Sequence, residues 1–251
     1  MSSNISNLKL RHLFYKTNLY NFLLNSNKPE NIFQNVLDPW KGDGQLADAI
    51  FQGRYNFGGE EIHAPNNPLW EPNGVGPWWI AEMHGFSWLR HFKARDGKAS
   101  RQHARSLITH WMKSGNNKFN PVSWQTDILG RRISAWISYA EMIKEDADRN
   151  FLETFYKLLT SQSKHLSRVI RKHSNGPEVF TALRGLLISG ICLSGGNKRY
   201  NQAKNILLST LNSQILNDGC HISKQPSITL DVLTDLIWIK NALPENDPLL
   251  E

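Results

Sequence analysis

Apolar positions along the chain recur mainly with the spacing of α-helices. The densest stretch, Pro77 to Phe92 (PWWIAEMHGFSWLRHF), places apolar residues on two faces of a helix and leaves a narrow polar strip around His84, Ser87 and His91. A helix that is apolar around most of its circumference is packed by neighbours on several sides. Proline suits the first turn of such a helix, because its missing N–H has no helical partner there. We therefore predict that this stretch is the central helix of an all-α core.

Similar i, i+3, i+4 and i+7 spacing continues towards the C-terminus. The apolar stripes group into helical hairpins over 78–113, 127–172 and 178–216, followed by an unpaired helix over 226–243. Short connections make consecutive helices antiparallel neighbours. Stacked pairs form either a solenoid or a closed α/α ring, and the lack of sequence-identical repeats favours the ring. The final helix lacks a partner, so we expect more protein to follow it.

The N-terminal part of the chain has a different pattern. Residues 1–37 form a leader with a basic amphipathic helix from about Leu8 to Leu24, which either docks on the domain or lies on a membrane surface. The domain then covers residues 38–251. Its first part, from Asp38 to Pro77, contains seven glycines and five prolines, which predicts an irregular segment with short strands around FQGRYNFGG. Long irregular segments of this kind are often binding loops.

Charge and tryptophan content change this picture. The chain has 251 residues, a net charge of +7 and nine tryptophans, which suggests aromatic platforms in the core or at a ligand site. Residues 95–176 hold 15 Lys and Arg against 7 Asp and Glu. This basic excess favours a polyanionic partner such as acidic polysaccharide, nucleic acid or anionic lipid, or else it is a solvated helical surface.

Cysteine usage and the N-terminus indicate the compartment. Cys192 lies in an apolar helical run and is expected in the core, and two cysteines do not indicate a disulfide framework. Lys9, Arg11 and Lys16 interrupt the first apolar residues, so no signal peptide is recognised, and no transmembrane segment is predicted. We expect a cytoplasmic protein, with the periplasm or cell envelope as the alternative.

Several strings resemble, in the same order, those of bacterial heparinase II/III-family proteins, especially an alphaproteobacterial branch. They are DPWKGD, FQGRYNFGGE, AEMHGFSWLRHF, NPVSWQTDILGRRISAWISYA and NDGCHISKQPSITLDVLTDL, within residues 37–243. The resemblance implies an incomplete α/α toroid, the N-terminal half of such proteins. Their C-terminal β-sandwich has no counterpart within these residues and is a possible missing partner domain.

The resemblance also implies an activity. Characterised members are polysaccharide lyases that cleave next to a uronic acid by β-elimination. This reaction needs a group that neutralises the uronate carboxylate, a base and an acid. Asn175 matches the family's carboxylate-neutralising asparagine, with His173 two residues earlier; alternatively, Asn175-Gly176 is a turn before a helix.

A second matching segment contains His221, in the string Asp218 to Ser223. Where catalytic members place a tyrosine a few residues later, this chain has Ile228. His221 either takes over the proton transfer or is a surface or capping residue. Whether the chain is an enzyme, a lyase by resemblance, therefore stays open.

Further candidates rest on chemistry alone. Arg131 and Arg132 form either a bidentate clamp for a carboxylate or sulfate, or an ion pair with Asp127 or Glu141. Three tryptophans at or near helix starts either stack on sugar rings or belong to the core: Trp78, Trp79 and Trp124.

These observations leave three classes of function. The first is an α/α-toroid domain whose cationic hollow binds or cleaves an acidic, uronate-containing glycan, with or without sulfate groups. The second is a non-catalytic glycan-binding or scaffold domain on the same fold. The third is a helical protein that binds nucleic acid, but no nucleic-acid motif is recognised, so no such partner is expected. We expect no cofactor and no metal, since His84 and His91, at i and i+7, are too far apart to share an ion.

Overall fold

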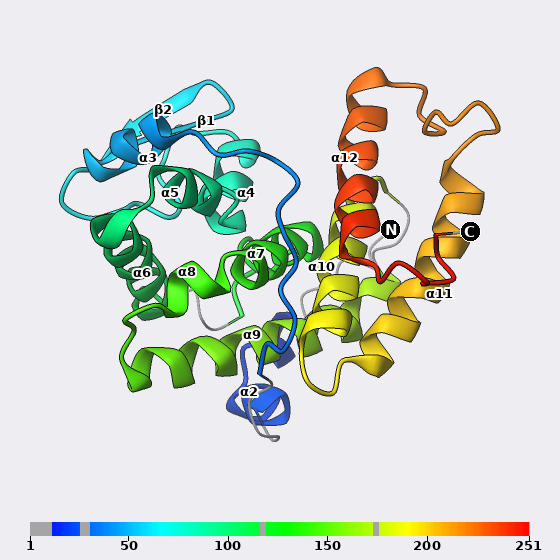
Figure 1. The fold of residues 1–251 in the computed structure, drawn as a ribbon, viewed down its shortest axis with the longest axis horizontal. Coiled ribbons are helices and arrows are strands. Elements are labelled where there is room, and N and C mark those ends of the chain that lie inside the picture. The colour runs from blue at the N-terminus through cyan, green and yellow to red at the C-terminus, as the bar shows by residue number, and fades with distance from the viewer. Residues whose placement is uncertain (1–11, 26–30, 116–118, 173–175, 251) are drawn as a thin grey trace.

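The computed structural model describes residues 12–25, 31–115, 119–172 and 176–250 of the chain, and the fold is all-α (Figure 1). The helices are α2 Asn18–Asn25, α3 Gly44–Phe51, α4 Pro77–Gly85, α5 Leu89–Arg95, α6 Gly97–Lys113, α7 Thr126–Ser138, α8 Ala140–Lys144, α9 Arg149–Val169, α10 Glu178–Cys192, α11 Asn197–Gln214 and α12 Pro226–Ala242, with a 3₁₀ turn at Ile170–Lys172. Helices α3 to α6 lie on one side of the molecule and α10 to α12 on the other, with α7 and α9 between them.

Helix α9 shows why the predicted stripes become packed helices. Asp148 caps its start, since the side-chain oxygen accepts a hydrogen bond from the Phe151 N–H at 2.8 Å. Phe155, Leu159 and Leu166 lie on one face and are fully buried. Helix α10 differs from α9, because it is buried on all sides from Val179 to Gly190; it ends before Gly195, which has φ 78°. The prediction of an all-α fold is confirmed.

The stretch 77–92 is not one helix as predicted. Helix α4 ends at Gly85, Phe86 adopts a left-handed conformation at φ 60°, and α5 begins at Leu89. Such a conformation is costly for a bulky residue and persists where its surroundings fix it. The buried Phe86 ring packs against aromatic rings from elsewhere in the core: Trp70, Trp88, Trp111 and Trp136. Side-chain packing therefore overrides the helical pattern here.

His84, expected on the polar strip of that helix, is fully buried. Its Nδ1 accepts a hydrogen bond from the Trp111 indole at 3.0 Å. Burial, reinforced by the charge of Arg132, lowers the pKa of His84 to about 3, so the imidazole is neutral at physiological pH. His84 is thus part of the core.

Helices α7 and α10 approach each other through glycine. A Cβ atom added at Gly185 would lie 2.4 Å from the Cα of Gly130, and one added at Gly130 would lie 2.1 Å from the Thr181 carbonyl oxygen. The two backbones are therefore closer than any side chain would permit. This contact fixes the spacing between the two helices, whose first turns carry the site described below.

The irregular segment contains the predicted short strands. Strands β1 Arg54–Phe57 and β2 Glu60–His63 form an antiparallel hairpin with Arg54 opposite His63. The intervening Gly58 and Gly59 have φ of 63° and 84°, as a tight hairpin turn requires. The Trp79 indole donates to the carbonyl of Tyr55 at 3.2 Å and joins the hairpin to α4.

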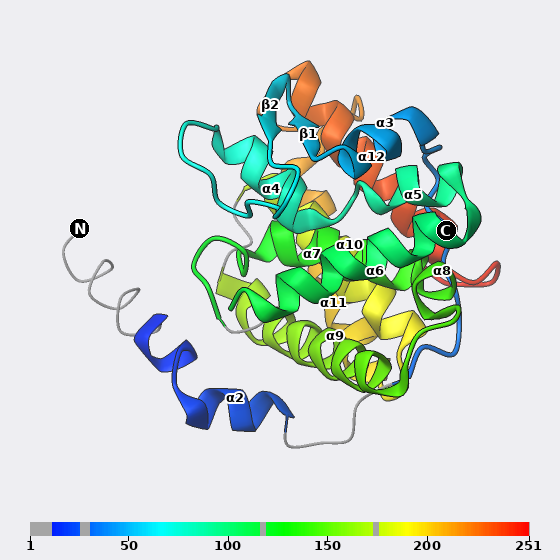
Figure 2. The same cartoon turned by 90° about the vertical axis from the view of Figure 1, so that its left-hand side faces the viewer.

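The leader is described from residue 12 and consists of a helical turn over 12–15 followed by α2, rather than one continuous helix. Tyr20 and Leu24 are buried, and the Tyr20 hydroxyl lies 2.6 Å from Nδ1 of His165 on α9. Figure 2 shows this segment projecting from the body of the molecule on the α9 side. Within the described ranges, every helix is too short or too polar to cross a bilayer.

Candidate functional site

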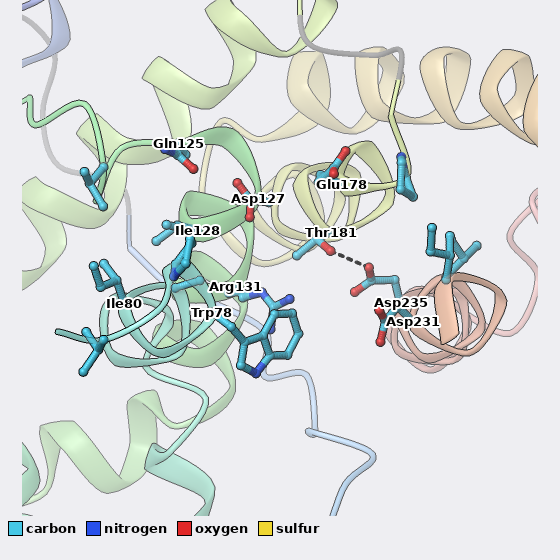
Figure 3. A pocket seen from close by; sticks show the side chains of 17 residues that line it. Trp78, Ile80, Gln125, Asp127, Ile128, Arg131, Glu178, Thr181, Asp231 and Asp235 are labelled. Atoms are coloured by element: carbon cyan, nitrogen blue, oxygen red, sulfur yellow. Dashed lines mark hydrogen bonds between the residues drawn. The ribbon is translucent and has the colours of Figure 1, made fainter. Parts of the chain in front are cut away.

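A cavity of about 570 Å³ lies between the N-terminal parts of α4, α7, α10 and α12 (Figure 3). Prolines favour helix initiation in the first turns of α4 and α12. Asp127 and Glu178 occupy the first turns of α7 and α10, where a negative charge offsets the positive end of the helix dipole. The polar and aromatic residues that line the cavity are Trp78, Gln125, Asp127, Arg131, Glu178, Thr181, Asp231 and Asp235.

Trp78 presents an indole at this cavity and is 49% exposed. The Arg131 guanidinium lies 4.8 Å from the centre of the indole ring, within the range of a cation–π contact. Arg131 is also paired with Glu82. Gly85 gives the arginine room, since a Cβ atom there would lie 3.2 Å from the Arg131 side chain. The indole is therefore held in place from one side.

Asp235 is tied to the wall formed by α10. It accepts hydrogen bonds from the Thr181 hydroxyl and from Arg184, both at 2.6 Å, and all three residues are buried. The Arg184 guanidinium in turn lies 4.3 Å from the centre of the Trp238 ring. This buried ion pair fixes α12 against α10 and leaves the other carboxylates of the cavity without an equally close cation of their own.

Asp127 and Asp231 have perturbed acidities. Burial raises the pKa of Asp127, and the positive charge of Arg131 partly offsets this effect. Burial also raises the pKa of Asp231; the positive charge of Arg131 partly offsets this effect, and the negative charge of Asp235 adds to it. Among the described lining residues, one side chain is basic, Arg131, and four are carboxylates. The cavity is therefore acidic, and the expected cationic hollow is not found here.

A second hollow of about 550 Å³ adjoins the first. The two share Gln125, Asp127 and Glu178 as lining residues, so they meet along the first turns of α7 and α10. The second hollow is aromatic where the first is acidic. Its rings come from the leader, from the segment before α7 and from α9: His12, Tyr15, Phe119, Trp124 and His165. Together the two hollows form a cleft, called here the N-terminal cleft because it lies at the N-terminal ends of α7 and α10.

The structure brings some of the predicted residues together. Trp78 and Arg131 line the first hollow, and Trp124 lines the second. Trp79 is fully buried and does not reach the cleft. The two tryptophans at 78 and 79 are separated because consecutive residues on a helix point about 100° apart.

The same geometry overturns the expected Arg131–Arg132 clamp. Arg132 is fully buried, and its guanidinium donates to three acceptors: Gln162 Oε1 at 2.6 Å, the His84 carbonyl at 2.9 Å and the Ser123 carbonyl at 2.8 Å. It therefore stabilises the core. Arg131 pairs with Glu82 rather than with Asp127 or Glu141, and Glu141 pairs with Lys144.

The candidates drawn from the family motifs lie elsewhere. His221 is buried in the connection between α11 and α12, with Nε2 3.1 Å from Gln214 and Nδ1 2.9 Å from Ser223. It lines neither hollow of the cleft. Ile228 does line the first hollow. Asn175 and His173 lie outside the described residues.

The acidic lining was missed by sequence reasoning, although part of it carries a readable signal. Asp231 and Asp235 stand at i and i+4, which places both carboxylates on one face of α12. Glu178 comes close to Asp127 only through the packing of α10 on α7, so no local pattern indicates it. In the part of the chain that the structure describes, no three His, Cys, Asp or Glu side chains are grouped to hold a metal ion.

Comparison with known proteins places this arrangement in a structural class. No protein-family profile matches the chain. It is similar to the solved structure of heparinase III, with a TM-score of 0.65 and 17% identity; the match covers 85% of this chain and 39% of heparinase III. It is also similar to heparan sulfate lyase HepC from Pedobacter heparinus, with a TM-score of 0.62 and 13% identity; that match covers 93% of this chain and 42% of HepC. At this level of identity the likeness shows the fold alone, an α/α toroid. The family resemblance is thus confirmed at the level of the fold.

The chain is also similar in sequence to a protein with a described cellular position. The chain is 23% identical over 219 residues to FtsZ-localized protein C of Caulobacter vibrioides strain NA1000 / CB15N, which covers 86% of this chain and 37% of that protein. The chain thus spans about two fifths of the length of these relatives.

Proposed function

We propose that this chain is an α/α-toroid domain that binds a glycan in the N-terminal cleft without cleaving it by β-elimination. One observation carries this proposal: Ile228, which the family resemblance matches to the tyrosine of catalytic members, lines the first hollow. An aliphatic side chain can neither take nor give a proton. The groups around it serve recognition better than elimination.

The lining suits a sugar. The exposed indole of Trp78, braced by Arg131, offers a flat apolar surface on which the C–H face of a sugar ring can stack. Gln125, Asp127 and Thr181 supply hydrogen-bond donors and acceptors around it. A hollow of about 570 Å³ lies within the size range of small-molecule sites.

Charge selects the class of sugar. A uronate in the first hollow would lie among Asp127, Asp231 and Asp235, and Arg131 is already paired with Glu82. Like charges at close range cost free energy, more so where burial reduces the screening by water. We therefore favour a neutral or amine-bearing glycan. The acidic, uronate-containing polysaccharide indicated by the family resemblance is the competing ligand.

A binding and cleavage panel tests this proposal. Neutral, amine-bearing and uronate-containing oligosaccharides are titrated calorimetrically, and each mixture is followed for ultraviolet absorbance of an unsaturated uronate. We expect binding of a neutral or amine-bearing glycan, no absorbance change, and loss of binding in Trp78→Ala. Phe33→Ala, which removes an exposed ring at the far end of α10, is the matched control. Formation of an unsaturated product, or binding restricted to uronate polymers, would contradict the proposal.

A second candidate is glycoside hydrolysis, because carboxylates from different helices line one hollow. Such enzymes pair a general acid of raised pKa with a second carboxylate. Asp127, whose pKa is raised by burial, would be the acid and Asp231 its partner. Release of reducing ends by the wild type, abolished in both Asp127→Asn and Asp231→Asn, would establish this activity. Its absence across the neutral-glycan panel would leave the binding role.

The relative named for its localisation with FtsZ bears on where the chain acts. We propose a cytoplasmic protein that gathers where FtsZ assembles, with the periplasm or cell envelope as the alternative. A fluorescent fusion imaged together with FtsZ tests this directly. A fusion spread evenly through the cell, or secreted from it, would contradict the proposal.

A further inference from the structure

The leader carries large apolar side chains that the rest of the chain does not cover. Five of them, called here the leader patch, are exposed to 41–67%: Leu13, Phe14, Leu19, Phe22 and Leu23. Only Tyr20 and Leu24 of α2 turn inward and are buried. The apolar surface of the segment is thus wider than its contact with α9, so one apolar face is buried against the domain and another is exposed.

Cations surround the end of α2. Lys164 Nζ and an Arg168 guanidinium nitrogen of α9 each lie 3.4 Å from a backbone carbonyl of the leader, those of Leu24 and Leu23. The same two cations line a hollow of about 540 Å³ together with Lys198 and Arg199, at the start of α11. The leader patch therefore borders a basic surface.

The segments that carry this basic surface come from long stretches of sequence without acidic residues. No Asp or Glu occurs before Glu30, between Glu153 and Glu178, or between Glu178 and Asp218. Residues 12–25 of the leader, the C-terminal half of α9 and all of α11 thus contain Lys and Arg but no acidic residue. Part of the basic excess of residues 95–176, namely Lys164 and Arg168, lies here and not in the N-terminal cleft.

We propose that the leader patch docks on the surface of an anionic lipid bilayer. A stripe of Leu and Phe flanked by cations fits the boundary between acyl chains and negatively charged headgroups. In this arrangement the leader patch enters the interface while Lys164, Arg168 and Lys198 approach the headgroups. A second copy of the chain fits less well, because two such faces would bring their cations together.

Vesicle co-sedimentation of the full chain tests the proposal. The probes are vesicles of phosphatidylcholine alone and vesicles that also contain phosphatidylglycerol. We expect salt-sensitive binding to the anionic vesicles, weakened about tenfold or more by Leu19→Ser/Phe22→Ser and about fivefold by Lys198→Gln. The matched control Leu46→Ser/Leu230→Ser removes two exposed leucines on α3 and α12, away from the leader, and should bind as the wild type does.

Three outcomes would overturn the proposal. The chain fails to bind either kind of vesicle; the leader variant binds as tightly as the control; or light scattering shows a dimer that the leader variant dissociates, with no vesicle binding. Circular dichroism of each variant shows whether the fold is retained. Since all substituted leader positions are exposed, we expect unchanged helical content.

Discussion

Gly185→Ala is expected to destabilise the fold, although alanine has a higher helix propensity than glycine. In an ordinary helix the change from glycine to alanine stabilises by about 1 kcal/mol, because it reduces the freedom of the unfolded chain. Here the added methyl carbon would lie 2.4 Å from Gly130 Cα and 2.6 Å from its carbonyl oxygen, so the backbone of α7 would have to move.

The size of the effect follows from that contact. Overpacking a well-filled core costs about 1–3 kcal/mol, and the contacting atoms are backbone rather than a flexible side chain. Because those atoms cannot rotate away, the upper part of this range, about 2–3 kcal/mol, applies. Subtracting the gain of about 1 kcal/mol in helix propensity leaves an expected net loss of about 1–2 kcal/mol. In a domain of this size that corresponds to a fall in Tm of about 2–4 °C for each kcal/mol.

Urea unfolding followed by tryptophan fluorescence measures this loss. Gly44→Ala is the matched control, because the nearest atom to its added methyl would be Arg95 Cα at 3.3 Å, and we expect a smaller effect there. Since α7 and α10 carry Asp127 and Glu178, Gly185→Ala should also weaken ligand binding in the cleft. A Tm equal to or above that of the wild type would refute the close approach of the two helices.

Three further predictions follow from buried polar groups. Arg132→Met should lower the free energy of unfolding by about 3–5 kcal/mol, since it removes a buried charge that satisfies three acceptors. Urea unfolding measures this loss, and in the same assay the control Arg131→Met should lower the free energy of unfolding by less than about 1 kcal/mol. Asp127→Asn should stabilise at neutral pH, because the folded-state pKa of Asp127 is raised and its ionisation opposes folding. In thermal melts the gain should fade as pH falls from the raised folded-state pKa to the ordinary aspartate pKa, below which both states are protonated. His84 has a folded-state pKa lowered to about 3, so the stability it contributes above its ordinary pKa should be lost as pH falls from there; in acid titrations His84→Gln should show a shallower loss than the wild type.

Helix spacing predicted much of the fold, whereas the site depended on tertiary contacts. Stripes such as Phe155, Leu159 and Leu166 predict a helix because one face of it is buried. The break at Phe86 could not be predicted, because the apolar pattern continues through it and the aromatic rings that fix it come from distant parts of the chain.

The site shows the same division. Arg131 and Arg132 are alike in type, and only the packing of α7 decides that one faces the cleft and the other the core. The positive charge of the middle of the chain left several partners open in the sequence, and only the fold shows that the first hollow is lined by carboxylates, while Lys164 and Arg168 line a hollow elsewhere. Carboxylates from α7, α10 and α12 gather where these helices begin, and their meeting is a property of the fold rather than of any single segment.

The two hollows of the N-terminal cleft differ in chemistry along its length, with carboxylates and Trp78 at one end and the rings of Tyr15, Trp124 and His165 at the other. A polymer lying along it would meet unlike surroundings at its two termini. Such a cleft would distinguish the two directions of a polysaccharide. A polysaccharide bound in the reverse direction would place its polar substituents against the aromatic hollow instead of the acidic one. If the proposed glycan lies along the N-terminal cleft, the cleft itself would therefore set its orientation.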